Sequence, residues 1–192
     1  EEGIGYLQIT EFDTVTLDQF NEAMAELRAD DMKGLILDLR SNPGGDLSVV
    51  VEIARRLLPA GLITYTEVPS GQRTEYTCDG EYEIDIPMVV LINGYSASAA
   101  EILAGAIQDH NKGAVVGTTS YGKGIVQRLI TLEDGSAVKL TVSGWFTPNG
   151  NNIQGSGIEP DVEAEYDTDL AETEGLDSQV EKGIEILKEK IG

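Results

Sequence analysis

The sequence predicts an α/β fold built around a largely parallel β-sheet. Two largely apolar runs, residues 34–39 (GLILDL) and 87–93 (PMVVLIN), have the pattern of strands that are buried on both faces. Apolar residues recur at helical spacing between these runs and around them, most clearly at residues 17–29. Such alternation of strands and helices is typical of a parallel sheet whose helices connect successive strands.

The remaining elements extend this alternation and interrupt it twice. We expect further short strands at residues 4–9 and 114–117, and further helices at residues 47–58 and 96–109. The interruptions are a two-stranded excursion at 63–68 and 73–78, and a β-hairpin at 126–132 and 137–147. The chain closes with an acidic linker at 163–175, expected to be solvated, and a helix at about 177–190 with Asp177 as its N-cap.

Length and charge limit the kinds of protein that this chain can be. Its 192 residues fit one domain, residues 1–192. The 34 acidic and 13 basic residues give a net charge of −21, which repels nucleic acid and anionic membranes, so we expect no nucleic-acid partner. The sequence has no run of 18 apolar residues, and we expect no integral membrane segment.

The first candidate for chemistry is the segment 93–106 (NGYSASAAEILAGA), where a buried strand gives way to a helix. A serine at a helix N-terminus lies beside backbone N–H groups without partners, and such donors can stabilise an oxyanion. Ser98 is the candidate nucleophile on this ground. The segment alone leaves a second interpretation open, in which Ser96 and Ser98 are helix caps in a tightly packed seam.

A serine nucleophile needs a base, and the sequence offers two kinds. The single histidine, His110, lies twelve residues along the helix from Ser98, about 18 Å away at ~1.5 Å per residue, and is more simply a C-terminal helix residue. Lys123 stands in SYGKGIVQ between two glycines. A lysine can act as base when burial favours its neutral amine. The single cysteine, Cys78, has no nearby base and cannot form an internal disulfide.

Four segments, in order, resemble the protease core of the carboxy-terminal processing proteases, also called tail-specific proteases. They are GLILDLRSNPGGDL, NGYSASAAEILAGAIQD, VVGTTSYGKGIVQ and FTPNGNNIQGSGIEPDV, within residues 34–162. One such match alone would be weak, whereas four in sequence order are specific. The resemblance implies a crotonase-like or ClpP-like superhelix with a β-hairpin excursion.

The resemblance also implies roles for individual residues. It makes Ser98 the nucleophile, Lys123 the general base and Gln127 the residue that orients the lysine. Gly44 and Ala99 match the backbone N–H donors of the oxyanion hole. The implied reaction is cleavage of protein or peptide substrates near their C-termini through an acyl-enzyme, without metal or cofactor.

Further expectations follow from the resemblance, and two alternatives stay open. Relatives carry a peptide-binding PDZ domain before a strand like residues 4–9; we expect this chain to lack it and to start abruptly. Relatives act outside the bacterial cytoplasm, in the periplasm or cell envelope, or in the chloroplast lumen. The oligomeric state is left open. The alternatives are a non-catalytic binding module, like the retinoid carrier of the retina, and a hydrolase or hydratase acting on acyl-CoA.

Overall fold

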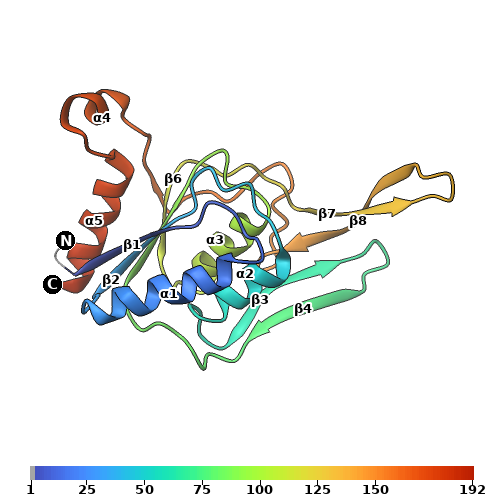
Figure 1. Cartoon of the computed structure of the whole chain (residues 1–192), viewed down its shortest axis with the longest axis horizontal. Coiled ribbons are helices and arrows are strands. Elements are labelled where there is room, and N and C mark those ends of the chain that lie inside the picture. The colour runs from blue at the N-terminus through green and yellow to red at the C-terminus, as the bar shows by residue number, and fades with distance from the viewer. Residues whose placement is uncertain (1–2) are drawn as a thin grey trace.

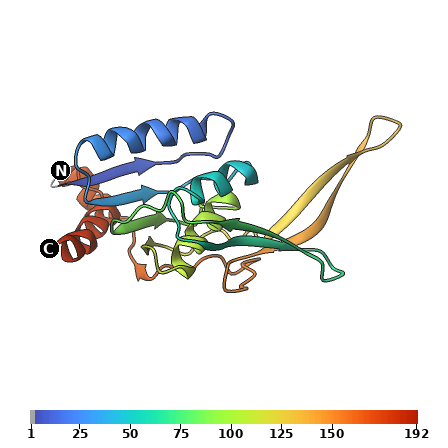
Figure 2. The same cartoon turned by 90° about the horizontal axis from the view of Figure 1, so that it is seen from below.

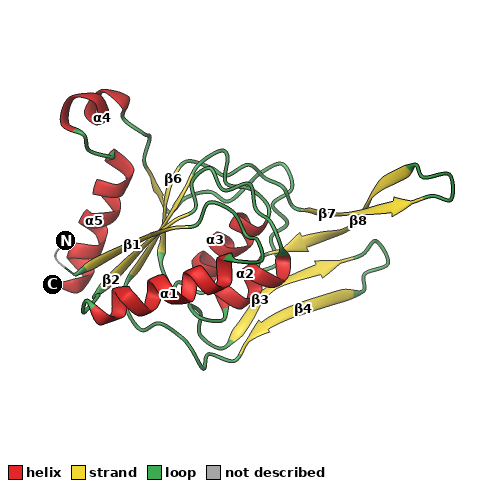
Figure 3. Cartoon of the chain, viewed as in Figure 1, coloured by secondary structure: helices red, strands yellow, loops and turns green. Residues whose placement is uncertain are grey.

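The computed structural model describes residues 3–192 and contains two sheets that differ in strand direction (Figure 3). The first sheet is parallel, in the order β1-β2-β5-β6-β9. Its strands are β1 (Ile4–Gln8), β2 (Gly34–Asp38), β5 (Met88–Ile92), β6 (Ala114–Gly117) and β9 (Val162–Glu163). The predicted parallel sheet is therefore confirmed, and the strands at its centre are the two apolar runs of the sequence.

Helices cover both faces of the parallel sheet (Figure 1). The helices are α1 (Thr16–Ala29), α2 (Leu47–Ala54), α3 (Ala99–Asp109) and α5 (Ser178–Ile191). Alternate residues of β2 separate the two cores: Leu35 and Leu37 pack with α1, α2 and α3, whereas Ile36 packs with Leu187 of α5. Every residue of β2 and β5 is buried because both faces are covered.

The second sheet is antiparallel, in the order β4-β3-β8-β7. It consists of β3 (Gly61–Glu67), β4 (Arg73–Cys78), β7 (Ile125–Thr131) and β8 (Ala137–Phe146). The β7–β8 hairpin extends away from the rest of the molecule (Figure 2). Its tip is exposed and nevertheless carries large apolar side chains, at Leu129, Ile130, Leu132, Val138 and Leu140. Both predicted two-stranded excursions are confirmed.

Two predicted helix boundaries were wrong for local reasons, and the predicted acidic linker contains a short helix without buried residues. The helix expected at 96–109 begins at Ala99, because Ser96 Oγ donates instead to the Leu39 carbonyl, 2.8 Å away. The helix expected at 47–58 ends at Ala54 and passes into tight turns. The linker expected at 163–175 starts at the last residue of β9 and contains a short helix, α4 (Thr168–Glu174), which is capped by Asp167.

A partly buried ion-pair network joins the end of β2 to the start of α5. Arg40 contacts Asp38 at 2.6 Å and Asp177 at 2.8 Å, and the Tyr6 hydroxyl donates to Asp38 at 2.6 Å. Burial opposes the charge of Arg40, but hydrogen bonds to Asp38 and Asp177 raise its pKa above the usual range. Asp177 also accepts hydrogen bonds from Gln179 N–H and Val180 N–H, which confirms it as the N-cap of α5.

Candidate active site

Ser98 occupies a strained backbone position directly before α3. Its φ is 57° and its ψ is −115°, a conformation that L-residues rarely adopt. The chain is held there from both sides, because Ala97 N–H donates to the Asn42 carbonyl and Ser98 N–H donates to Glu101 Oε2 at 2.8 Å. Strain of this kind persists only where surrounding contacts enforce it, and it is common at active sites. The half-buried Ser98 side chain lines a cavity.

The glycine-rich loop after β2 lies against Ser98. A Cβ added at Gly44, whose φ is +104°, would lie 2.7 Å from Ser98 Cβ and 2.9 Å from Ala99 N. In this conformation Gly44 N–H donates to Asn42 Oδ1 at 2.8 Å, so it becomes an oxyanion donor only if that bond opens. Gly45 and Ala99 line the cavity. Ala99 is the first residue of α3, where helical N–H groups lack intrahelical partners.

The backbone of Lys123 is fixed by two buried side chains. Lys123 N–H donates to Glu101 Oε2 at 2.9 Å, and the indole N–H of Trp145 donates to the Lys123 carbonyl at 2.7 Å. The flanking Gly124 is held by Gln154, whose Oε1 accepts from its N–H. The Lys123 side chain, in contrast, is exposed, although the sequence-based argument for a lysine base relied on burial.

Glu101 links the serine segment to the lysine segment, although it is not among the residues predicted from the sequence. Its buried side chain accepts four hydrogen bonds, from Ser98 N–H, Ser120 Oγ–H, Gly122 N–H and Lys123 N–H. Four donors converging on one carboxyl group fit the acceptor capacity of a carboxylate. The S-x-x-E spacing from Ser98 to Glu101 is the capping-box pattern and could have identified it.

One cavity of about 320 Å³ brings most of the predicted site residues together. Ser98, Ala99, Lys123 and Gln127 all line it. Gln127 projects from β7 and is exposed. Within residues 3–192 no hydrogen bond joins Ser98 Oγ to Lys123 Nζ. A hydroxyl, an amine and helix N-terminal N–H groups around one cavity are the groups that acyl transfer needs.

Two other sequence candidates lie outside this cavity. His110 caps the C-terminus of α3, as predicted, and its Nε2 is 2.7 Å from the Leu62 carbonyl. Cys78 is buried and its Sγ accepts from Gly80 N–H. Among the described residues no group of three or more His, Cys, Asp or Glu is arranged to hold a metal ion.

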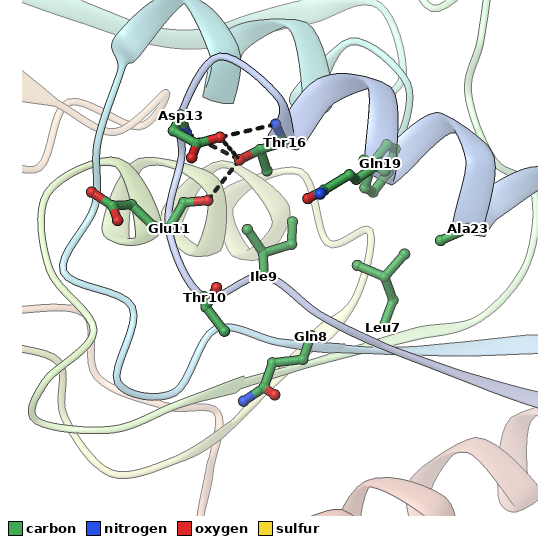
Figure 4. Close-up of a pocket in the computed structure, with 10 residues that line it drawn as sticks. Leu7, Gln8, Ile9, Thr10, Glu11, Asp13, Thr16, Gln19 and Ala23 are labelled. Carbon is green, nitrogen blue, oxygen red and sulfur yellow. Dashed lines mark hydrogen bonds between the residues drawn. The ribbon is translucent and has the colours of Figure 1, made fainter.

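A second cavity, of about 260 Å³, lies between β1 and α1 (Figure 4). Its polar side chains bond to one another: Thr16 Oγ1 donates to Asp13 Oδ1 at 2.8 Å. Hydrogen bonds from Thr16 and from Val15 N–H lower the pKa of Asp13. None of the predicted site residues lines this cavity.

The chain belongs to peptidase family S41, whose family model matches residues 3–164. It is 40% identical over 160 residues to a carboxyl-terminal-processing protease of Synechocystis, covering 83% of this chain and 38% of the relative. It is 39% identical over 190 residues to a carboxy-terminal-processing protease of Bartonella bacilliformis, covering 91% of this chain and 44% of the relative. The chain thus spans less than half the length of these relatives.

Solved structures show the same fold. The photosystem II D1 C-terminal processing protease superposes with a TM-score of 0.82 at 34% identity, covering 96% of this chain and 46% of that one. Within residues 3–192 no helix is both long and apolar enough to cross a membrane. The family resemblance stated from four sequence segments is confirmed, and so is the α/β fold with its hairpin.

Proposed function

We propose that this chain is the catalytic core of a serine endopeptidase that cleaves protein substrates near their C-termini through a Ser98–Lys123 dyad. The observation that carries the proposal is the strained Ser98 at the N-terminus of α3, facing a cavity that Lys123 also lines. Membership in peptidase family S41 supports it. The protein or peptide substrate and an extracytoplasmic location belong to the same proposal.

The proposed reaction is acyl transfer in two steps. Ser98 Oγ attacks the scissile carbonyl carbon while Lys123 Nζ takes the hydroxyl proton, and the C–N bond then breaks as Lys123 protonates the leaving amine. Water attacks the resulting ester, and Lys123 moves the proton back to Ser98. Ala99 N–H, with Gly44 N–H once it is released from Asn42, stabilises the oxyanion in both steps.

The position of Lys123 sets one requirement for this reaction. Its backbone is fixed by Glu101 and Trp145, so the amine approaches Ser98 Oγ by rotation of its own side chain. We propose that Gln127 hydrogen-bonds the amine in that position, since both line the cavity. Catalytic hydrogen bonds are often long before substrate binds and shorten in the complex.

The test is cleavage of β-casein, followed by mass spectrometry, for the wild type, Ser98→Ala and Lys123→Ala. We expect each variant to lower the cleavage rate by about 10⁴-fold or more, because dyad members act as a unit. Ser70→Ala, which changes an exposed serine in the β3–β4 turn, is the matched control and should cleave normally. Cleavage by either dyad variant at the wild-type rate would contradict the proposed mechanism.

A further inference from the structure

The catalytic cavity has a charge opposite in sign to the rest of the chain. The protein carries 34 acidic and 13 basic residues. The residues that line the cavity nevertheless include no aspartate or glutamate and include two lysines, Lys123 and Lys139. In a molecule with a net charge of −21, the cavity is therefore a local cationic site that faces solvent.

Lys139 is not paired with a carboxylate in the described part of the chain. Within the same described residues, seven other basic side chains form ion pairs, whether they are buried or exposed. They are Lys33, Arg40, Arg55, Arg56, Arg73, Lys112 and Lys182. The Lys139 ammonium has no such contact within residues 3–192, although carboxylates outnumber bases in this chain. An unpaired ammonium that lines the same cavity as Ser98 is available to a ligand.

The register of the hairpin places Lys139 on the face that lines the cavity. Gln127 is opposite Thr141, and Leu129 is opposite Lys139. Residues two apart on a strand share a face, so Lys139 lies on the same face as Gln127 and about 7 Å farther along the hairpin. Arg128 lies between them in sequence, points to the opposite face and does not line the cavity.

We propose that Lys139 determines specificity by binding a carboxylate of the substrate peptide next to the catalytic cavity. This inference rests on the proposed peptidase function, since it assigns a peptide to the cavity. The carboxylate is either the α-carboxylate of the substrate's C-terminus or the side chain of an aspartate or glutamate. A single exposed ammonium contributes little binding free energy. It can therefore shift the relative affinities of peptides that the cavity already binds, but it does not bind a peptide by itself.

The test measures binding to Ser98→Ala protein, so that it does not depend on cleavage. The probes are a fluorescent peptide of alanine, valine and leucine with a free C-terminal carboxylate, its C-terminal amide, and amides with glutamate or glutamine at each of the last five positions. Dissociation constants are measured for three proteins: Ser98→Ala alone, Ser98→Ala with Lys139→Gln, and Ser98→Ala with Arg128→Gln. The last is the control, because it removes the same charge from the opposite face of the hairpin.

We expect one acidic probe to bind about three-fold more tightly than its neutral partner, in the range of exposed ion pairs. Lys139→Gln should abolish that difference, Arg128→Gln should leave it, and 1 M salt should reduce it. If the free acid binds more tightly than its amide, the carboxylate is that of the substrate's C-terminus. If one glutamate amide binds more tightly than its glutamine partner, the carboxylate is that of a side chain. Equal loss in both variants, or no difference among the probes, would overturn the role of Lys139. Failure of the wild type to cleave casein would instead count against the proposed function.

Discussion

The parallel sheet and the antiparallel sheet contribute to the candidate site in different ways. Ser98 follows β5 of the parallel sheet, where every strand residue is buried and the serine backbone is held in a strained conformation. Lys123 leads into β7, most of whose residues are exposed. The proposed nucleophile is thus fixed by a packed core, whereas the lysine is fixed only through its backbone. The two residues of the proposed dyad therefore depend on different kinds of contact.

After the dyad variants themselves, the largest effect is expected from crowding the proposed nucleophile in the packed half. Gly44→Ala places a methyl group 2.7 Å from Ser98 Cβ, at a φ of +104° that an alanine rarely adopts. We predict a fall in casein cleavage of at least about 100-fold, the magnitude of losing one oxyanion donor. The measurement is the initial cleavage rate per folded molecule.

Gly135→Ala is the matched control for this prediction. Gly135 also has a positive φ, +83°, but nothing lies within 4 Å of its added Cβ. It lies in the turn of the β7–β8 hairpin, between the two strands. We predict near wild-type cleavage for this variant. An equal loss in both variants would mean that backbone strain alone, and not contact with Ser98, controls activity.

A smaller effect is expected at the junction of the two halves. Glu101→Gln replaces a carboxylate that accepts four hydrogen bonds by an amide whose NH₂ opposes some of those donors. We predict a loss of about 3 kcal/mol in the free energy of unfolding, measured in urea. Cleavage per folded molecule should also fall by about ten-fold, because Ser98 and Lys123 lose their common anchor.

Asp38→Asn separates stability from activity in this comparison. Asp38 is as buried as Glu101, but its side chain binds Arg40 and Tyr6 rather than Ser98 or Lys123. We predict a loss of about 3 kcal/mol in the free energy of unfolding here too, because Arg40 loses its buried partner. Cleavage per folded molecule should stay within about two-fold of the wild type, because a substitution that is not coupled to the site changes its energetics by less than about 0.5 kcal/mol. Equal loss of cleavage in both variants would remove the special role of Glu101.

The smallest effect concerns the pH dependence of stability and involves Tyr6, which does not line the candidate cavity. Burial, together with the hydrogen bond to Asp38, raises the pKa of Tyr6 to about 12. Because the unfolded pKa is about 10, the folded state holds the proton more tightly, and this contribution to stability is complete below pH ~10 and is lost as pH rises through 12. Tyr6 is 45% exposed, so the effect is small. Unfolding in urea between pH 9 and 12 should show a shallower pH dependence for Tyr6→Phe; identical slopes would contradict this.

The sequence predicted the parallel sheet and the serine segment better than the lysine segment. The physical reason is that the first depend on local patterns and the second on contacts between residues far apart in the sequence. The buried strands β2 and β5 are encoded by uninterrupted apolar runs, and Asp177 is encoded by local capping chemistry. The start of α3 at Ala99 was missed although the capping-box spacing from Ser98 to Glu101 marks Ser98 as the N-cap. The contact of Ser96 Oγ with the distant Leu39 carbonyl, in contrast, is reported by no local pattern.

The lysine half depended on contacts that sequence spacing does not reveal. Glu101 and Trp145 hold the backbone of Lys123, and both lie 22 residues from it in the sequence. Their segments meet only in the folded chain, so the sequence does not show these contacts. Lys123 lies two residues before β7 and its side chain is exposed, which no spacing in the sequence indicates. The β7–β8 hairpin that follows extends away from the rest of the molecule (Figure 2). Gly44 was predicted as a donor from its segment, and its hydrogen bond to Asn42 Oδ1 emerged only from the loop geometry. The roles of Ser98, Lys123, Gln127, Gly44 and Ala99 stay predictions.

The most direct measurement is to trap the acyl-enzyme and find where the acyl group is attached. Wild type and Lys123→Ala are mixed with the p-nitrophenyl ester of N-acetylalanine, quenched in acid, digested and mapped by tandem mass spectrometry. We predict acylation of the Ser98 oxygen in the wild type and a greatly slowed reaction in Lys123→Ala. Acylation at another residue, or equally fast acylation of Ser98 without Lys123, would contradict the Ser98–Lys123 dyad.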